Sequence, residues 1–350
     1  MYGSKNKKVL VVATSRQTRG GITSVIKALE KGKQWKKYHC YWVQTHRDGP
    51  TWKKIFYFVF GLTDFLVRLP FYDIIHIYTA DSSTEKRKTI FSRLTKLFSK
   101  RLIVNLHSSG KEFSIAGPYK NRYSYSFRNA NKIIALSESW KKNIIQEFPF
   151  TKNKIDIIYN PCPTVNPSKF ENQKPYILFA GTLTHRKGYD DLIKAFAKIA
   201  TKYPKWTLKL AGNGEIEEGK NIAKKMGIEN QVEFLGWING DQKDKYFGEA
   251  SVYCLPSYSE GFPMGVLDAW AYNISVITTP VGGILDFGID GENALLFPPG
   301  NIDKLADCLE RLMSDEVLRK HLSIEGGKLA KENFSIELIS QKLDKLYSSL

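Results

Sequence analysis

The strongest constraint on the fold is an alternation of strand-like and helix-like segments along the chain. Short apolar runs recur in the first half, among them KVLVVAT, YHCYWVQT, DIIHIYT, RLIVNLH and KIDIIYN. Helix-like segments separate these runs. Buried strands joined by helices are typical of a parallel sheet that helices cover on both faces. The chain is therefore predicted to be an α/β protein.

The alternation stops once, at PCPTVNPSKFENQKP (161–175), which is rich in Pro, Asn and Ser and has no periodicity. It restarts with PYILFAGTL and continues through TLKLAG, VEFLGWI, SVYCLPS and SVITTPV. We interpret the stretch as a linker between two βα domains, which the length of 350 residues also favours. Ligands of open α/β sheets bind beyond the carboxyl ends of the strands, so we expect two such domains to face each other across a cleft.

Composition excludes several classes of protein. No apolar run reaches the length of about 18 residues that a membrane span needs, and the N-terminus lacks a signal-peptide cleavage site. The cysteines Cys40, Cys162, Cys254 and Cys308 form no CxxC pair, which predicts reduced thiols in a cytoplasm. There is no Asp-x-Asp motif and no His cluster, so no metal site is expected.

The positive charge is confined to the first half. Residues 1–170 contain 31 Lys and Arg against 10 Asp and Glu, whereas residues 171–350 contain 21 against 25. A half of this kind is suited to nucleic acid, an anionic membrane or an acidic substrate.

Two predicted strand ends in the first half carry candidate site residues. Gly20 and Gly21 in TSRQTRGGITS open a helix, where backbone N–H groups can approach an anion. The alternative is an ordinary strand-to-helix turn. His107 in NLHSSG stands at the end of another strand, where it is either structural or catalytic.

A third strand end, in AGTLTHRKGYDDL, places Arg186 and Lys187 before a helix predicted to run to about Lys202. Cations at a helix N-terminus oppose the helix dipole, so they are explained if they neutralise a bound anion. The alternative is a solvated loop. Gly212 and Gly214 in LKLAGNGEIEEG form half of a dinucleotide fingerprint, and VGGILD (281–286) is another possible anion-binding turn.

Two acids stand eight positions apart in SYSEGFPMGVLDAWAYN (257–273). Pro263 suits the first position of a helix predicted over Met264 to Tyr272, with Glu260 in the loop before it. Asp268 then lies about one and a half turns into the helix. This spacing argues against a tight acid/base pair. The alternative is a surface loop acid and a helix-face acid without a ligand.

In sequence order these motifs resemble the retaining glycosyltransferases of family 4, which have the GT-B fold. The resemblance rests on AGTLTHRKG, AGNGE, VEFLG, LPSYSEGF, VGGILD and FPPGN, and it covers about residues 157–330. The first half is similar to the acceptor domain more loosely, through its GGI loop, His107 and LSESW (136–140). The members that it resembles most act in bacterial surface-polysaccharide assembly.

The resemblance implies three segments. It implies an acceptor-binding Rossmann-like domain over 1–165 and a donor-binding Rossmann-like domain over 166–332. A C-terminal helix within 333–350 is expected to pack back toward the first domain.

It also implies a metal-independent, retaining hexosyltransferase-type reaction with a nucleotide diphosphate sugar as donor and no cofactor. His107, Lys187 and Glu260 would be catalytic, with His107 near the bond being broken and Lys187 at the leaving diphosphate. Glu260 would hold sugar hydroxyls and Asp268 the ribose. The implied donor-binding residues are Gly20, Gly21, Thr182, Arg186, Lys187, Gly212, Glu260, Gly261, Phe262, Pro263, Met264, Gly265 and Asp268.

The chain departs from the family pattern at two of these positions. Asp268 stands where members usually have Glu, so its side chain is one methylene shorter. Thr182 stands where many members have Arg, which removes one diphosphate cation, and Arg186 is a possible substitute.

Two segments of the first half bear on the acceptor. Residues 84–101 are basic, with Ile90, Leu94, Leu97 and Phe98 at helical spacing, and residues 52–71 are strongly apolar. The plain interpretation is that both apolar faces pack on the sheet and the charges are solvated. A basic amphipathic surface also suits anionic lipids. We therefore predict peripheral attachment to the inner face of the plasma membrane and a glycan or polyprenyl-diphosphate-linked acceptor.

Three other functions compete with this interpretation. A nucleic-acid-binding protein would use the same basic half, but no recognition motif is present, so no nucleic-acid partner is expected. A dinucleotide-dependent oxidoreductase would need the glycine that AGNGE lacks. A GT-B sugar-nucleotide epimerase is the nearest rival, since it would share the fold and the donor site.

Overall fold

The structure, a computed structural model, describes residues 7–80, 82–107, 120–165 and 173–350. It divides the chain into two compact units, Met1–Pro161 with Ile336–Leu350 and Cys162–Ser335. The boundaries expected from the sequence, 165/166 and 332/333, lie a few residues from these. Part of the expected linker, residues 166–172, lies outside the described residues.

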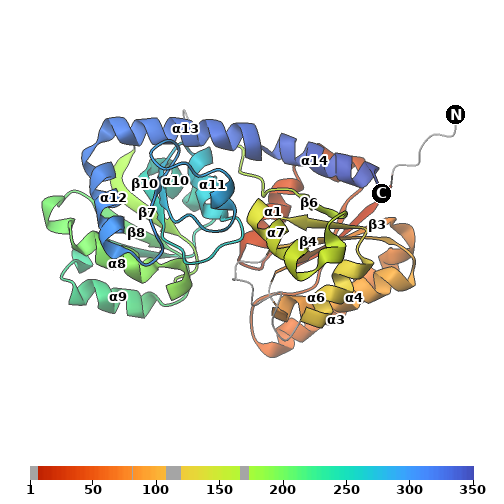
Figure 1. Cartoon of the computed structure of the whole chain (residues 1–350). Helices are drawn as coiled ribbons and strands as arrows, with labels where there is room; N and C mark the ends of the chain where they lie inside the picture. The colour runs from red at the N-terminus through yellow and green to blue at the C-terminus, as the bar shows by residue number, and fades with distance from the viewer. Residues whose placement is uncertain (1–6, 81, 108–119, 166–172) are drawn as a thin grey trace. The chain divides into compact units, whose positions relative to one another are not determined.

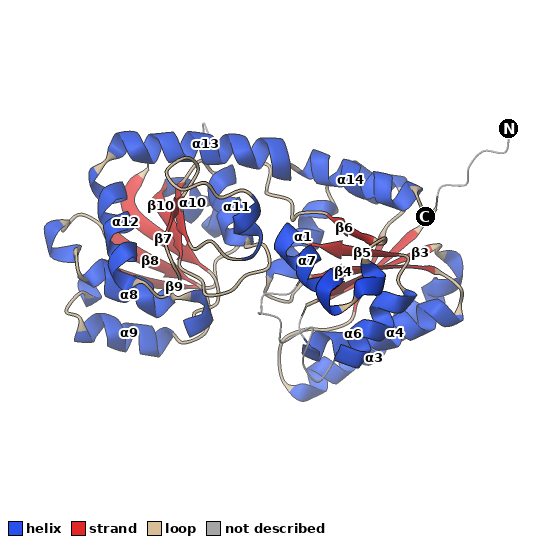
Figure 2. Cartoon of the chain, in the orientation of Figure 1, coloured by secondary structure: helices blue, strands red, loops and turns tan. Residues whose placement is uncertain are grey.

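In the N-terminal unit, the described strands form a six-stranded parallel sheet of order β2-β1-β3-β4-β5-β6. Its strands are β1 (Val9–Ala13), β2 (Tyr41–Gln44), β3 (Ile74–Thr79), β4 (Arg101–Leu106), β5 (Lys132–Ala135) and β6 (Ile155–Ile157). Its helices are α1 (Gly21–Leu29), α2 (Lys33–Lys37), α3 (Thr51–Arg68), η1 (Leu69–Phe71), α4 (Ser82–Leu97), α6 (Lys120–Asn129), α7 (Glu138–Glu147), η2 (Pro149–Thr151) and α14 (Ile336–Ser348). Figure 2 shows helices on both faces of this sheet.

The C-terminal helix α14 belongs to the N-terminal unit (Figure 1). Its Asp344 accepts a hydrogen bond of 2.7 Å from the hydroxyl of Tyr38. Its Tyr347 hydroxyl lies 2.8 Å from Nδ1 of His76 in the middle of β3. These two contacts attach the C-terminal helix to the N-terminal unit.

The C-terminal unit repeats the same architecture, with the strand order β12-β11-β10-β7-β8-β9 and parallel pairing throughout the described strands. Its strands are β7 (Lys174–Ala180), β8 (Thr207–Ala211), β9 (Val232–Gly236), β10 (Ala250–Leu255), β11 (Ser275–Thr278) and β12 (Leu295–Leu296). Its helices are η4 (His185–Lys187), α8 (Tyr189–Ala197), η5 (Ala200–Lys202), α9 (Ile216–Lys225), η6 (Glu229–Gln231), α10 (Gly240–Glu249), α11 (Met264–Ala271), η7 (Gly282–Asp286), α12 (Ile302–Ser314) and α13 (Glu316–Phe334).

The central strands explain why the α/β prediction is right. Every residue of β1, β3, β10 and β11 is buried. Such strands are mostly apolar on both faces, and their sequences are therefore near-continuous apolar runs, interrupted by a few buried polar residues such as His76 and Ser275, rather than alternating ones. Among the described residues, no helix has the combination of length and hydrophobicity that a membrane crossing requires.

The buried face of α4 differs from the expected one. Ile90, Leu97 and Phe98, which were expected to pack inward, are exposed. The buried face instead includes the polar residues Glu85 and Lys88. Hydroxyl groups make this possible, since Glu85 accepts hydrogen bonds from Ser126 and other neighbours, and Lys88 donates one of 2.7 Å to Thr45. Burial raises the pKa of Glu85 to about 7 and lowers the pKa of Lys88.

The prediction for residues 52–71 is wrong in the same way. This segment forms α3 and η1, and only Gly61 and Phe65 of α3 are buried. Most of its large apolar side chains face outward.

Candidate active site

In the C-terminal unit, the order in which the chain adds strands to the sheet reverses between β7 and β10, which pair in parallel. From β7 the chain builds β8 and β9 on one side, and then returns to place β10 and β11 on the other side. The carboxyl ends of β7 and β10 are therefore adjacent, and the loops that follow them diverge. This is the position at which open α/β sheets bind their ligands.

The loop after β7 is fastened to the loop after β10. Arg186 accepts a backbone hydrogen bond of 2.9 Å from the N–H of Tyr258, and its guanidinium donates one of 2.6 Å to the carbonyl of Ser259. Gly188 has a φ of 70°, and a Cβ there would collide with the carbonyl of Pro256. Only glycine allows this approach, so the glycine after Lys187 fixes the two loops together.

Lys187 and Glu260 meet where these loops touch. The Lys187 ammonium lies 2.5 Å from Oε1 of Glu260, and the carboxylate is almost entirely buried while the ammonium is partly exposed. Ser257 donates a hydrogen bond of 2.7 Å to the same oxygen, and Nη1 of Arg186 lies 3.7 Å from it. Two cations thus surround one carboxylate beside the reversal point of the sheet.

The expected single helix over Lys187 to about Lys202 is divided into η4, α8 and η5. Lys187 ends the short turn η4, and α8 begins at Tyr189 after the left-handed Gly188. Asp190 and Asp191 occupy the first turn of α8, where acids favour the helix dipole.

Glycines bring two further loops to the same edge of the sheet. Gly212, after β8, lies so close to the carbonyl of Gly181 that a Cβ would collide with it. Gly282, after β11, has a φ of 57° and lies against the carbonyls of Glu260 and Gly261. The structure therefore gathers the loops after β7, β8, β10 and β11 around Lys187 and Glu260. Thr182 lies exposed in the first of them.

The loop after β10 leads into α11. Phe262 is buried, and its ring centroid lies 5.1 Å from that of Phe334. Pro263 is the N-cap of α11 rather than its first helical residue, because its ψ of 115° is extended, and Met264 begins the helix. Gly265 lies where a Cβ would collide with the hydroxyl of Tyr253.

Asp268 does not share its partner with Glu260. It is buried in α11, and its Oδ2 lies 2.7 Å from the ammonium of Lys243 in α10. The two acids therefore occupy separate ion pairs, as expected from a spacing unsuited to an acid/base pair.

The remaining predicted residues lie in the N-terminal unit. Gly20 is the N-cap of α1 after β1, with a φ of 152°, and Gly21 is the first residue of that helix. His107 follows β4 and is half-buried, and its ring lies 5.3 Å from that of Tyr78. Burial lowers the pKa of His107 to about 3, so its imidazole is neutral near pH 7. Its Nε2 is buried and has no hydrogen-bond partner among the described residues.

Sequence reasoning missed the residues that support these side chains. Ser257 holds Glu260, Lys243 neutralises Asp268, and Tyr258 donates a hydrogen bond of 2.6 Å to Asp191. Ser257 offered a usable signal, because it stands three residues before Glu260 in the same loop.

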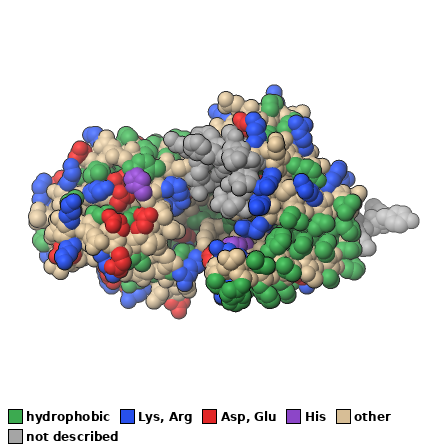
Figure 3. Space-filling model, turned by 90° about the horizontal axis from the view of Figure 1, so that it is seen from below, with side chains coloured by type: hydrophobic (Ala, Val, Ile, Leu, Met, Phe, Trp, Pro, Cys, Tyr) green, Lys and Arg blue, Asp and Glu red, His purple; other side chains and the backbone are tan. Residues whose placement is uncertain are grey.

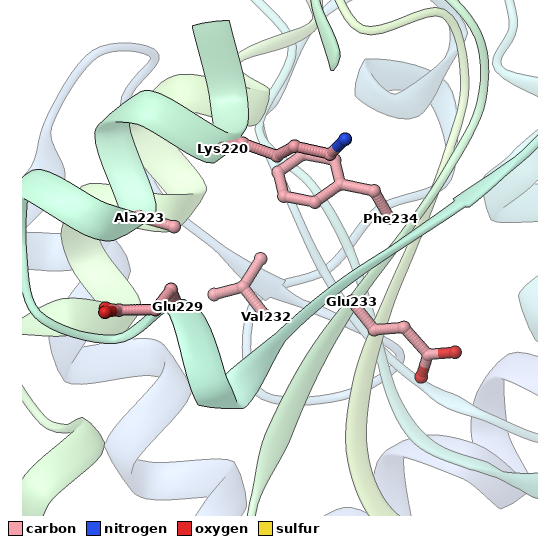
Figure 4. A pocket seen from close by; sticks show the side chains of 6 residues that line it. All are labelled: Lys220, Ala223, Glu229, Val232, Glu233 and Phe234. Carbon is pink, nitrogen blue, oxygen red and sulfur yellow. The ribbon is translucent and has the colours of Figure 1, made fainter. Parts of the chain in front are cut away.

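A separate hollow lies between α9, η6 and β9 (Figure 4). Its lining residues are Lys220, Ala223, Glu229, Val232, Glu233 and Phe234. None of them is a predicted site residue. Among the described residues there is also no group of three or more His, Cys, Asp or Glu that could hold a metal ion.

Comparison with known proteins identifies the family. Residues 11–165 match Glycosyltransferase Family 4, and residues 164–329 match Glycosyl transferases group 1. An uncharacterized glycosyltransferase of Methanocaldococcus jannaschii is 32% identical over 253 residues, which cover 71% of this chain and 68% of that protein. The chain belongs to glycosyltransferase family 4.

Other glycosyltransferases match over a shorter part of their length. An uncharacterized glycosyltransferase of Haemophilus influenzae is 35% identical over 61% of this chain and 60% of its own length. The capsular polysaccharide biosynthesis glycosyltransferase CapM of Staphylococcus aureus is 26% identical over 63% and 62%. The matched region thus spans about three fifths of these two relatives.

Solved structures show the same fold. HepE of Anabaena, in complex with UDP and glucose, superimposes with a TM-score of 0.79 at 18% identity, over 98% of this chain and 100% of HepE. The predicted GT-B fold with two Rossmann-like units is confirmed.

Proposed function

We propose that this member of family 4 is a retaining glycosyltransferase that uses a nucleotide diphosphate sugar as its donor. The observation that carries the proposal is the pair of cations, Lys187 and Arg186, held around Glu260 at the reversal point of the C-terminal sheet. The names of relatives support transfer rather than epimerisation, and HepE was solved with UDP and glucose. A sugar-nucleotide epimerase is therefore not favoured.

The chemistry of the donor explains why two cations and one acid should meet. Cleavage of the bond between sugar and phosphate leaves additional negative charge on the diphosphate, and fixed cations lower the energy of that charge. The partly exposed Lys187 ammonium can move from the Glu260 carboxylate to the diphosphate. Glu260 is then free to accept hydrogen bonds from sugar hydroxyls, so the donor replaces one ion pair by two charge-assisted contacts.

The other residues have supporting roles in this proposal. Asp268 would bind the ribose, and Gly20 and Gly21 would offer backbone N–H groups to the diphosphate. His107, neutral because burial lowers its pKa to about 3, would line the sugar site as a hydrogen-bonding group rather than as a cation. The departing phosphate would take the acceptor's proton on the front face, so that no protein nucleophile is required, and the two cations would neutralise the diphosphate in place of a metal ion.

The proposed acceptor is a glycan linked to a polyprenyl diphosphate, in the assembly of a bacterial capsule, exopolysaccharide or O-antigen. CapM, which is named for capsular polysaccharide biosynthesis, supports this pathway class. The reaction would take place at the inner face of the plasma membrane.

A panel of nucleotide sugars tests the proposal. We expect one donor to release its nucleoside diphosphate slowly in water and much faster when lipid-linked glycans are added. The anomeric coupling of the product, measured by NMR, should match that of the donor sugar. An inverted product would overturn the retaining mechanism, and conversion of one nucleotide sugar into another without release of diphosphate would indicate the epimerase.

A further inference from the structure

Helix α3 of the N-terminal unit presents an apolar face to the outside. Among the exposed side chains, Trp52 is 67% accessible, Phe56 is 59%, Phe60 is 56% and Val67 is 65%. These residues and their exposed neighbours recur at intervals of three and four, which places them on one side of a helix. We call this set the α3 apolar face: Trp52, Ile55, Phe56, Val59, Phe60, Leu66 and Val67.

The opposite side of α3 makes its contacts with the fold. Gly61 lies against the backbone of Gln44 in β2, where a Cβ would collide. Phe65 is fully buried, with its ring 5.0 Å from that of Phe91 in α4. The packing of α3 is therefore satisfied without its apolar face.

The apolar face is continuous. Thr63 is the one polar residue within its arc, and its hydroxyl donates a hydrogen bond of 3.1 Å to the carbonyl of Val59 in the same helix. Leu97 and Phe98 at the end of α4, and Phe71 in η1, are exposed as well. Figure 3 shows hydrophobic side chains gathered over this side of the N-terminal unit, with Lys and Arg side chains along one edge.

The charges near the face are predominantly positive. Lys53 lies beside the apolar face in the first turn of α3, and Lys86, Arg93 and Lys96 are exposed along α4. The single acid of α3 is neutralised locally, because Oδ1 of Asp64 lies 2.6 Å from Nε of Arg68.

We propose that the α3 apolar face inserts into the headgroup region of an anionic membrane. An apolar stripe on a surface helix with basic residues at its border matches the structure of an anionic lipid interface, with acyl chains beneath phosphates. A second copy of the chain would instead bring two basic borders together, which costs free energy. The proposal depends on the proposed function only where it links the membrane to a lipid-linked acceptor. The apolar face and its basic border are features of α3 and α4 whatever reaction the protein catalyses.

Flotation of the full chain with vesicles tests this inference. We expect the wild type to float with vesicles of phosphatidylcholine and phosphatidylglycerol, and only weakly with phosphatidylcholine alone. The double substitution Phe56→Glu with Phe60→Glu should weaken binding to vesicles at least about 10-fold, because two apolar side chains that would contact lipid are replaced by charges that anionic lipids repel. The matched control is Val317→Glu with Met226→Glu, two exposed apolar positions of the C-terminal unit, and it should bind as the wild type does.

A second readout reports insertion directly. The tryptophan fluorescence of the wild type should shift to shorter wavelength on vesicles and be quenched by brominated acyl chains, and Trp52→Phe should remove most of both effects.

Equal flotation of the double variant and the wild type would overturn the proposal, and so would a wild-type dimer that the double variant abolishes. Diphosphate release from the donor in the absence of vesicles should be the same in all variants. If the wild type released no diphosphate from any donor, that would count against the proposed function but would not affect the result on membrane binding.

Discussion

Replacing Lys187 by alanine is expected to lower the rate of diphosphate release about 100- to 1,000-fold at saturating donor. The reason is that the leaving diphosphate would lose the cation nearest to it, and removal of one fixed donor to a developing anion has an effect of this size. The rate is measured as nucleoside diphosphate produced from the donor that the panel identifies. Full activity of Lys187→Ala would contradict the role of this residue at the leaving group.

The same substitution should also destabilise the C-terminal unit, because it leaves the Glu260 carboxylate buried without its closest cation. The double substitution of Lys187→Ala with Glu260→Gln separates the two effects. It should restore part of the lost thermal stability, since no buried charge remains, but none of the activity. Lys174→Ala is the control, because Lys174 forms an exposed ion pair with Glu249 and its loss should change stability by less than about 1 kcal/mol.

The substitution Gly282→Ala is expected to be nearly as damaging, although residue 282 carries no functional group. Its φ of 57° strains any residue with a Cβ, and that Cβ would collide with the carbonyls of Glu260 and Gly261. The free energy of unfolding should fall by about 2–4 kcal/mol, from strain and displacement together. Activity should fall about 100-fold, because a shift of about 1 Å in a positioning loop has that effect.

Gly227→Ala is the matched control for this prediction. Gly227 has a φ of 69°, and a Cβ there would meet nothing within 4 Å. It should therefore show only the conformational strain, about 1–2 kcal/mol, with unchanged activity. Urea unfolding and the diphosphate-release assay measure both quantities. If the two alanine variants behaved alike, the contact between the loops after β10 and β11 would not matter to the site.

The sequence predicted the fold because burial dictates composition in this architecture. Strands such as β3 and β10 are buried throughout, and they are therefore largely apolar runs that can be recognised without a structure. The loops that hold Lys187 and Glu260 were recognised for a related reason. Gly188 and Pro263 mark turns between strand and helix, and such turns lie at the carboxyl edge of a parallel sheet.

The partners of the site residues could not be predicted in this way. The contact between Lys187 and Glu260 joins residues separated by 73 positions, and it depends on β7 and β10 being neighbours. The sequence gives no strand order, so this contact between the two residues was not predicted. Lys243 was missed as the partner of Asp268 because a lysine on an exposed helix is ordinary.

The orientation of α3 and α4 was mispredicted because hydrophobicity was assumed to point inward. In α4, hydroxyl groups from neighbouring elements satisfy Glu85 and Lys88, so a polar face is buried. In α3, Gly61 and Phe65 are buried and Phe58 and Leu62 pack partly against the core, whereas most of the other large apolar residues are left outside. A periodic pattern gives the arc of a helix that is apolar, but it does not tell which solvent or protein surface that arc meets.

Hydrogen exchange with bound nucleoside diphosphate shows whether the loops around Lys187 and Glu260 bind the donor. The full chain would be incubated with and without the nucleoside diphosphate of its donor, and amide exchange followed by mass spectrometry. We expect slower exchange in residues 181–188, 257–265 and 281–284, which include the loops after β7, β10 and β11, and no change in residues 216–236 around the hollow of Figure 4. Slower exchange in residues 216–236, with those three loops unaffected, would contradict this expectation.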